Sequence, residues 1–361
     1  MRFTNAVVVS WTLWGIAYYL YSPYLTVFLK GIVKEDYIGI LYILSSIVGL
    51  AYALLPKITT RIKEITVASL IVSGLGLILL SFSNNVEVAS LSILLYSMYW
   101  VSVPIFYLLM RDNVAKVWAI SMIPALIIPF IGGKIIAVLG LKGIFTTSGV
   151  IMALTALPLI NVEIRGREES VQERKDNKIN LSPLIFTILP LSIALPYLYV
   201  NTPLSLIPIV YALGEGIGIG IALYLSKAKR GLAIALSTFS LISLNNVIPF
   251  GAMFYGISEA LTALGIDGIR IKSLKDSVKV TLTEISMWLV GYAVATALFA
   301  IAPFLPTVYA SLLAILFTLV TLFTLPKFMR VRIVKKAKSL NKIPFWLEML
   351  DEGIFPYFKF A

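Results

Sequence analysis

Long apolar runs separated by short polar breaks recur twelve times along the 361-residue chain. They cover residues 5–29, 37–56, 65–83, 88–110, 117–139, 142–160, 183–201, 204–225, 231–248, 250–269, 278–302 and 305–326. A helix needs about 20 apolar residues to cross the hydrocarbon core of a bilayer, and each run is close to that length. Only 13% of the residues are charged, about half the usual share of a soluble domain. The pattern predicts an all-α integral membrane protein with about 12 transmembrane helices.

The basic residues predict the orientation of these helices. With a cytoplasmic N-terminus, 26 of the 30 Lys and Arg residues fall in segments on the cytoplasmic side, leaving only Lys30, Lys34, Lys134 and Lys142 elsewhere. Cytoplasmic loops of membrane proteins carry such an excess. We therefore expect both termini in the cytoplasm and a place in the cell membrane. The net charge of +12 then indicates contact with the anionic inner leaflet, and no nucleic-acid partner is expected.

The longest polar break divides the chain into two halves. It holds five basic and five acidic residues within 163–178, which is typical of a solvated linker. We expect an N-terminal six-helix bundle over 1–160, a cytoplasmic linker over 161–182, a C-terminal six-helix bundle over 183–329 and a basic cytoplasmic tail over 330–361. Within the tail an amphipathic stretch, 344–349, follows the basic residues, and it either contacts anionic lipid or is solvated.

Two short basic loops in equivalent positions of the two halves share a pattern. They read Thr60-Arg61-Ile62-Lys63 and Ser226-Lys227-Ala228-Lys229. Together with the paired six-helix halves, these loops resemble the major facilitator superfamily, over essentially the whole chain. The family's loop signature is Gly-x-x-x-Asp-Arg-x-Gly-Arg, of which only the base survives here, as Arg61 and Lys227. The resemblance implies that these loops hold the two bundles together. Because the other signature positions are substituted in this chain, we expect the contact between the loops to be built differently.

The fifth apolar run bears on the direction of transport that the resemblance implies. Its segment Pro129-Phe130-Ile131-Gly132-Gly133 resembles the end of the family's antiporter signature, with Ile128 in place of the first Gly. This slightly favours efflux. The fourth run lacks the membrane-embedded Arg of many proton antiporters in the family, and Arg111 lies only at its end. Import and uniport therefore stay open.

Three glutamates are the candidates for proton coupling. The chain has no His and no Cys, so disulfides, thiol chemistry and His-bound metal or haem are excluded, and no cofactor or metal site is expected. A charge at bilayer mid-depth costs at least about 2.5 kcal/mol, which makes Glu215, Glu259 and Glu284 notable within their runs. Glu259 and Glu284 have a simpler reading, as a neutral stabilising acid and as a hydrated group near the inner interface.

Glu215 lies among glycines that allow flexing or close helix packing. These glycines are Gly214, Gly216, Gly218 and Gly220. Together with Pro129, Gly132 and Gly133 they are the candidate gating positions. Packing explains the glycines but does not require the Glu.

Aromatic residues are unevenly distributed among the runs. The first, fourth, seventh and tenth runs contain 18 Phe, Tyr and Trp residues, against six in the third, sixth, ninth and twelfth. In the family that the chain resembles, the former set lines the central cavity. The resemblance therefore implies an aromatic cavity, although core packing is the alternative for each residue. The candidate cavity residues are Trp11, Trp14, Tyr18, Tyr96, Tyr99, Trp100, Tyr197 and Tyr255.

These features predict a secondary active transporter that works by alternating access, and they also indicate the chemical class of its cargo. Aromatic faces with buried carboxylates and no mid-depth base suit a cationic or neutral small organic molecule. The chain lacks the Gly-x-x-x-x-Gly-Lys-Ser/Thr phosphate-binding sequence, so a proton gradient is the expected energy source and no enzymatic activity is expected. The alternatives are a sugar-type importer or uniporter, a membrane-embedded enzyme, and a transporter-like sensor. A monomer is expected.

Overall fold

The computed structural model describes residues 3–110, 114–160, 162, 181–200, 202–224, 230–248, 250–258, 269 and 271–337. Within these ranges the secondary structure is helical, and no strand occurs. The N-terminal half comprises α1 (Phe3–Lys30), α2 (Glu35–Tyr52), α3 (Leu55–Ile58), α4 (Ile62–Ser81), α5 (Val86–Tyr96), η1 (Ser97–Val101), α6 (Val103–Met110), α7 (Val114–Met122), η3 (Ile123–Leu126), α8 (Ile128–Leu154) and η4 (Leu157–Leu159). The C-terminal half comprises α9 (Ser182–Ala194), η6 (Leu195–Tyr197), α10 (Ile207–Tyr224), α11 (Arg230–Phe239), η7 (Ile242–Asn246), α13 (Leu274–Ile301) and α14 (Leu305–Ala337).

Among the described residues, six helical segments are long and apolar enough to cross a membrane. They are Glu35–Ile58, Ile62–Ser81, Val86–Met110, Ile128–Leu159, Leu274–Ile301 and Leu305–Leu322. Shorter apolar helices cover Ser182–Tyr197, Ile207–Ile219 and Leu232–Asn246. For the described residues, the all-helical class and the presence of helices of membrane-spanning length are thus confirmed. The count of twelve spans and the cytoplasmic termini stay predictions, and half of the expected tenth run, residues 259–268, lies outside the described residues.

Local sequence explains where several helices start and stop. At the start of α5 the side chain of Asn85 accepts a hydrogen bond from the Val88 N–H at 2.9 Å. At the start of α13 Ser273 and Asp276 form a reciprocal capping box, which satisfies backbone donors that a helix leaves unpaired. Gly140 interrupts α8 with a φ of +72°, a conformation that glycine adopts without strain. The break lies at the predicted boundary between the runs 117–139 and 142–160.

Two predicted runs are less regular than expected. The run 88–110 was expected to be one helix, but it passes through the 3₁₀ segment η1 before α6. The run 117–139 divides into α7, η3 and the first part of α8. Pro104, Pro124 and Pro129 stand at these transitions, and proline supplies no N–H to continue the ladder of helical hydrogen bonds. At the other end of the chain, α14 continues to Ala337, so the first residues of the predicted tail extend the last helix.

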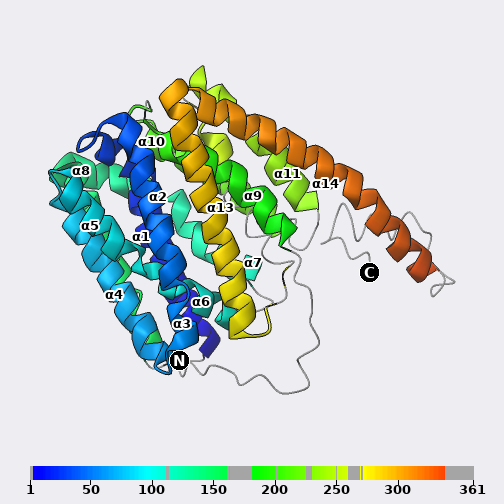
Figure 1. The fold of residues 1–361 in the computed structure, drawn as a ribbon, viewed down its shortest axis with the longest axis horizontal. Helices are drawn as coiled ribbons and strands as arrows, with labels where there is room; N and C mark the ends of the chain where they lie inside the picture. The colour runs from blue at the N-terminus through cyan, green and yellow to red at the C-terminus, as the bar shows by residue number, and fades with distance from the viewer. Residues whose placement is uncertain are drawn as a thin grey trace.

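Helices of the two halves lie side by side around α13. In Figure 1, α4, α5 and α8 lie on one side of the molecule and α9, α11 and α14 on the other, with α2 and α13 between them. α13 packs along α2 and α6 of the N-terminal half as well as along α9. On the N-terminal side α4 packs closely on α8, where a Cβ at Gly74 would overlap the carbonyl oxygen of Gly149. This arrangement sets α13 against the N-terminal helices across one shared cavity.

Candidate functional site: an aromatic cavity between the halves

A cavity of about 160 Å³ lies between the N-terminal helices and α13. By volume it has room for on the order of ten water molecules. Its walls come from α1, α2, the continuous stretch α5–η1–α6, and α7 on the N-terminal side, and from η6 and α13 on the C-terminal side. The residues that matter most for its chemistry are Trp11, Trp14, Tyr18, Tyr21, Tyr42, Tyr96, Tyr99, Trp100, Tyr107, Trp118, Glu284, Trp288 and Tyr292.

The α1 wall is a ladder of stacked rings. Trp11 and Trp14 have ring centroids 4.9 Å apart at an interplanar angle of 13°, and Trp14 and Tyr18 are 5.3 Å apart at 7°. The spacings of three and four residues bring these side chains to one helical face. Stacked aromatic pairs stabilise each other by about 0.5–1.5 kcal/mol beyond their area burial. The three predicted α1 residues therefore form one rigid surface.

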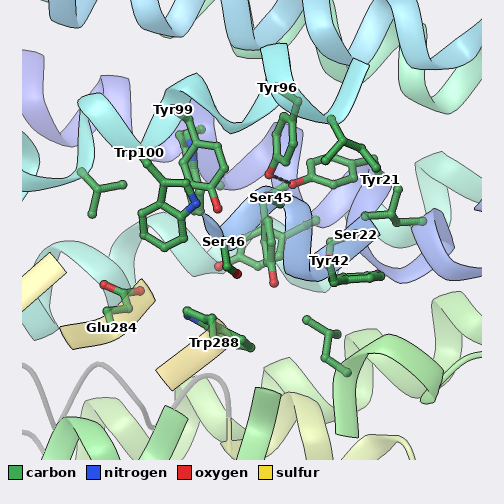
Figure 2. Close-up of a pocket in the computed structure, with 18 of the residues that line it drawn as sticks. Tyr21, Ser22, Tyr42, Ser45, Ser46, Tyr96, Tyr99, Trp100, Glu284 and Trp288 are labelled. Atoms are coloured by element: carbon green, nitrogen blue, oxygen red, sulfur yellow. Dashed lines mark hydrogen bonds between the residues drawn. The ribbon is translucent and has the colours of Figure 1, made fainter. Parts of the chain in front are cut away.

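The opposite wall is built on the 3₁₀ segment. Tyr96 ends α5 and Tyr99 and Trp100 lie in η1, and Figure 2 shows all three projecting from the same stretch of chain. Residues three apart eclipse in a 3₁₀-helix, which sets the Tyr96 and Tyr99 rings 5.0 Å apart. The hydroxyl groups of Tyr96 and Tyr21 are hydrogen bonded to each other, drawn as the dashed line in Figure 2. The irregular segment that the sequence did not predict thus shapes this wall.

Glu284 supplies the carboxylate of the cavity. It is 8% exposed and accepts a hydrogen bond from the Tyr107 hydroxyl at its Oε2, at 2.8 Å. Trp288 lies one turn along α13, and Figure 2 shows both α13 side chains facing the cavity across from Tyr99 and Trp100. The Tyr107–Glu284 bond joins α6 of one half to α13 of the other. Among the described residues on the wall, Glu284 is the sole acid and there is no Lys or Arg.

A second contact between the halves lies further along α13. A Cβ at Gly39 of α2 would overlap the Thr296 hydroxyl oxygen and lie 2.7 Å from the Tyr197 hydroxyl of η6. Glu284 and Thr296 are twelve residues apart, or about 18 Å along a helix at 1.5 Å per residue. The two halves thus meet near both ends of this stretch of α13.

The other predicted acids lie apart from this cavity. Glu215 is fully buried in α10 but is not among the residues that line the cavity. Its neighbour Gly214 allows a close approach, since a Cβ there would overlap the Met253 carbonyl oxygen and lie 3.2 Å from the Gly256 Cα. Glu259 lies outside the described residues. Of the two predicted glutamates that the structure describes, Glu284 lies at the aromatic wall and Glu215 does not.

The remaining predicted residues occupy several places. Six of the eight predicted aromatic residues line the cavity, whereas Tyr197 stacks on Phe299 at a centroid distance of 3.9 Å and Tyr255 lies buried beside Phe239. Arg61 is exposed before the start of α4. Lys227 lies outside the described residues, and Gly218 and Gly220 lie within α10.

The predicted gating positions differ in their surroundings. A Cβ at Gly132 would lie 3.2 Å from Leu20 on α1, while one at Gly133 would meet only the Pro208 side chain, at 3.7 Å. Pro129 provides the carbonyl oxygen to which the Tyr24 hydroxyl donates at 3.4 Å. A Cβ at Gly216 would lie 2.6 Å from Leu126. These positions serve helix packing in the observed arrangement.

Several residues of the cavity wall are not among those predicted from the sequence. Tyr107 follows Tyr96 by eleven residues, about three helical turns, so it lies on the same helical face as that predicted cavity residue. Trp288 follows Glu284 by one turn, which helical spacing could also have revealed. Trp118 and Tyr42 gave no such signal, because only the packing of α7 and α2 against α1 brings them to the cavity.

Comparison with solved structures shows which architecture this is. The human organic anion transporter MFSD10 matches with a TM-score of 0.60 at 14% identity, covering 89% of this chain and 99% of its own. The E. coli fucose:proton symporter FucP, a major facilitator superfamily transporter, matches with 0.59 at 11% identity, covering 89% and 98%. The nucleoside transporter NupG matches with 0.58 at 13% identity, covering 90% and 98%.

The chain has the major facilitator superfamily fold. No protein-family model matches the sequence, and no curated protein matches it. The likeness is therefore one of architecture, which confirms the fold that the two loops and the six-plus-six pattern implied. In this major facilitator fold, the aromatic cavity lies where the two halves of the chain meet.

Proposed function

We propose that the chain is a secondary active transporter of the cell membrane that moves a cationic or neutral small organic molecule by alternating access. The proposal includes twelve spans in two six-helix bundles, with both termini cytoplasmic. The observation that carries it is the cavity between the halves, aromatic on its N-terminal side and bearing the Glu284 carboxylate on its C-terminal side. We propose no enzymatic role.

The chemistry of the wall supports this class of cargo. Aromatic faces attract organic cations and also pack on the apolar faces of neutral ring compounds. An organic anion would need a compensating positive charge once removed from water, and the described wall has no Lys or Arg. The similar transporters are named for different substrates, namely an organic anion, fucose and nucleosides. The likeness in fold therefore does not indicate which cargo this chain carries.

Proton coupling is proposed at Glu284, with Glu215 and Glu259 as further candidates. Burial makes an ionised carboxylate costly unless hydrogen bonds stabilise it, and here Tyr107 provides such a bond. A cargo group or a proton that competes for the carboxylate would therefore change the link between the halves. FucP, of the same fold, is named as a proton symporter. We favour efflux because of the segment Pro129–Gly133.

A neutral cargo is the second candidate, as in a sugar-type importer or uniporter. Hydroxyl groups on the wall could bind a sugar-like molecule, and they come from Ser22, Ser45, Ser46 and Ser121 beside the tyrosines. In this case we expect transport that does not depend on a proton gradient.

The test is transport into proteoliposomes containing a pH-sensitive dye. Purified protein is screened against organic ammonium compounds, neutral sugars and nucleosides, and organic anions, with and without a pH gradient. We expect saturable uptake of an ammonium or neutral compound together with proton movement, which Glu284→Gln abolishes. Glu87→Gln, at an exposed acid of the first turn of α5, is the matched control. Uptake of anions only, or coupling that Glu284→Gln leaves intact, would contradict the proposal.

A further inference from the structure

Two indole N–H groups on the cavity wall have no hydrogen-bond acceptor in the described part of the chain. The Nε1 atoms of Trp14 and Trp118 are buried, and neither has a hydrogen-bond partner among the described residues. Both side chains line the cavity. Nearly all buried polar groups in folded proteins are paired, and a buried donor left unpaired is destabilising. These two donors therefore mark a position where an acceptor would be stabilised.

Packing fixes both indoles on the wall. Trp14 stacks on Trp11 at 4.9 Å, and Trp118 packs against the same Trp11 ring at 5.9 Å. The two helices can approach because a Cβ at Gly15 would already lie 3.1 Å from the Ser121 carbonyl oxygen. Because the rings are held by their neighbours, the N–H groups cannot easily turn toward another partner.

The surroundings favour an uncharged acceptor. The Trp11 ring lies 6.5 Å from that of Tyr107, whose hydroxyl contacts Glu284, and this acid is the charged residue on the described wall of the cavity. An anionic group would meet this carboxylate and, on the described wall, no base. Ether, carbonyl and hydroxyl oxygens carry no such electrostatic cost, and an indole N–H can donate to each of them.

We propose that Trp14 and Trp118 form an acceptor subsite, which binds an uncharged oxygen or ring nitrogen of the cargo. The cargo's cationic or donor group lies at Glu284, so that the molecule is recognised at two points. This inference rests on the proposed function and narrows it to ring compounds that carry both kinds of group. One of the two indoles donates the hydrogen bond to this acceptor, so removal of that N–H removes the bond.

The test compares phenethylamine with its para-methoxy derivative, which adds one uncharged acceptor oxygen. Binding is measured through thermal stabilisation of the purified full-length protein over a range of ligand concentrations. One gained hydrogen bond corresponds to about a 2- to 12-fold gain in affinity. We expect the methoxy compound to bind more tightly by this factor in wild type. Trp14→Phe or Trp118→Phe should remove the preference while phenethylamine itself still binds.

A control variant and a second measurement keep the test decisive. Trp100→Phe also shrinks a cavity tryptophan, but we expect it to retain the methoxy preference. In wild type labelled with ¹⁵N-tryptophan, which has six indole signals at most, the methoxy compound should shift one or two N–H signals that phenethylamine leaves in place. This measurement does not depend on the folding of any variant.

The outcomes separate the subsite from the proposed function. Equal affinity of the two amines in wild type, or a preference that survives in both Phe variants, would overturn the subsite alone. If neither amine stabilises wild type, the cationic cargo is wrong and the subsite built on it is wrong as well. Tighter binding of para-methoxyphenylacetate than of either amine would contradict the uncharged acceptor.

Discussion

Removing the Tyr107 hydroxyl should release the bond that joins α6 to α13. Tyr107→Phe deletes one oxygen atom and leaves the buried ring in place, while Glu284 loses its 2.8 Å donor. A hydrogen bond to a charged group contributes about 1.5–3 kcal/mol. If the bond holds the halves together, its loss shifts the equilibrium toward the separated arrangement about 10- to 150-fold.

The absence of native cysteine makes this shift measurable. The chain has no Cys, so a single cysteine placed at Ser46, which lines the cavity and is 2% exposed, is labelled by N-ethylmaleimide without background. We expect Tyr107→Phe to increase the labelling rate by the factor above. Tyr24→Phe is the control, since that hydroxyl donates over 3.4 Å to a backbone carbonyl and Tyr24 does not line the cavity.

A double-mutant cycle separates this bond from general destabilisation. Glu284→Gln alone should also increase the labelling rate, and Tyr107→Phe should add little in the Glu284→Gln background, because the shared interaction is already weakened. A labelling rate of Tyr107→Phe equal to that of wild type would refute the reasoning. So would a rate increase in the double variant equal to the product of the increases in the two single variants.

Three other perturbations test separate parts of the molecule. Gly39→Val inserts side-chain atoms against Thr296, and overpacking of this kind costs about 1–3 kcal/mol; we expect slower transport in proteoliposomes, whereas Gly133→Ala, with space around its Cβ, should match wild type. Ser273→Ala removes the N-cap of α13 and should lower the free energy of unfolding in a denaturant titration by about 1 kcal/mol, while an unchanged value would show that the capping box contributes nothing. Glu215→Gln should abolish the pH dependence of transport if this buried acid carries the proton, and normal transport across the pH range would remove it as a candidate.

Sequence patterns predicted the helical class and the apolar runs, because these features depend on the bilayer that surrounds the chain. Apolar runs must form helices in a bilayer, where every backbone polar group has to be satisfied internally. The 3.6-residue period then explains why Trp11, Trp14 and Tyr18 share a face. The same patterns missed η1 and the break between α7 and α8, where prolines change the hydrogen bonding locally.

By itself, the sequence determined that the chain is helical and membrane-embedded, that α1 carries an aromatic face, and that carboxylates must serve any proton coupling. Local period and composition suffice for such properties. Only the tertiary structure decided which carboxylate meets that aromatic face, because Glu284 reaches Tyr107 across 177 positions of sequence through the packing of α13 against α6. It also decided that Trp118 joins the wall and that Glu215 lies elsewhere. Contacts between distant helices depend on how whole faces fit together, and no local pattern encodes that fit.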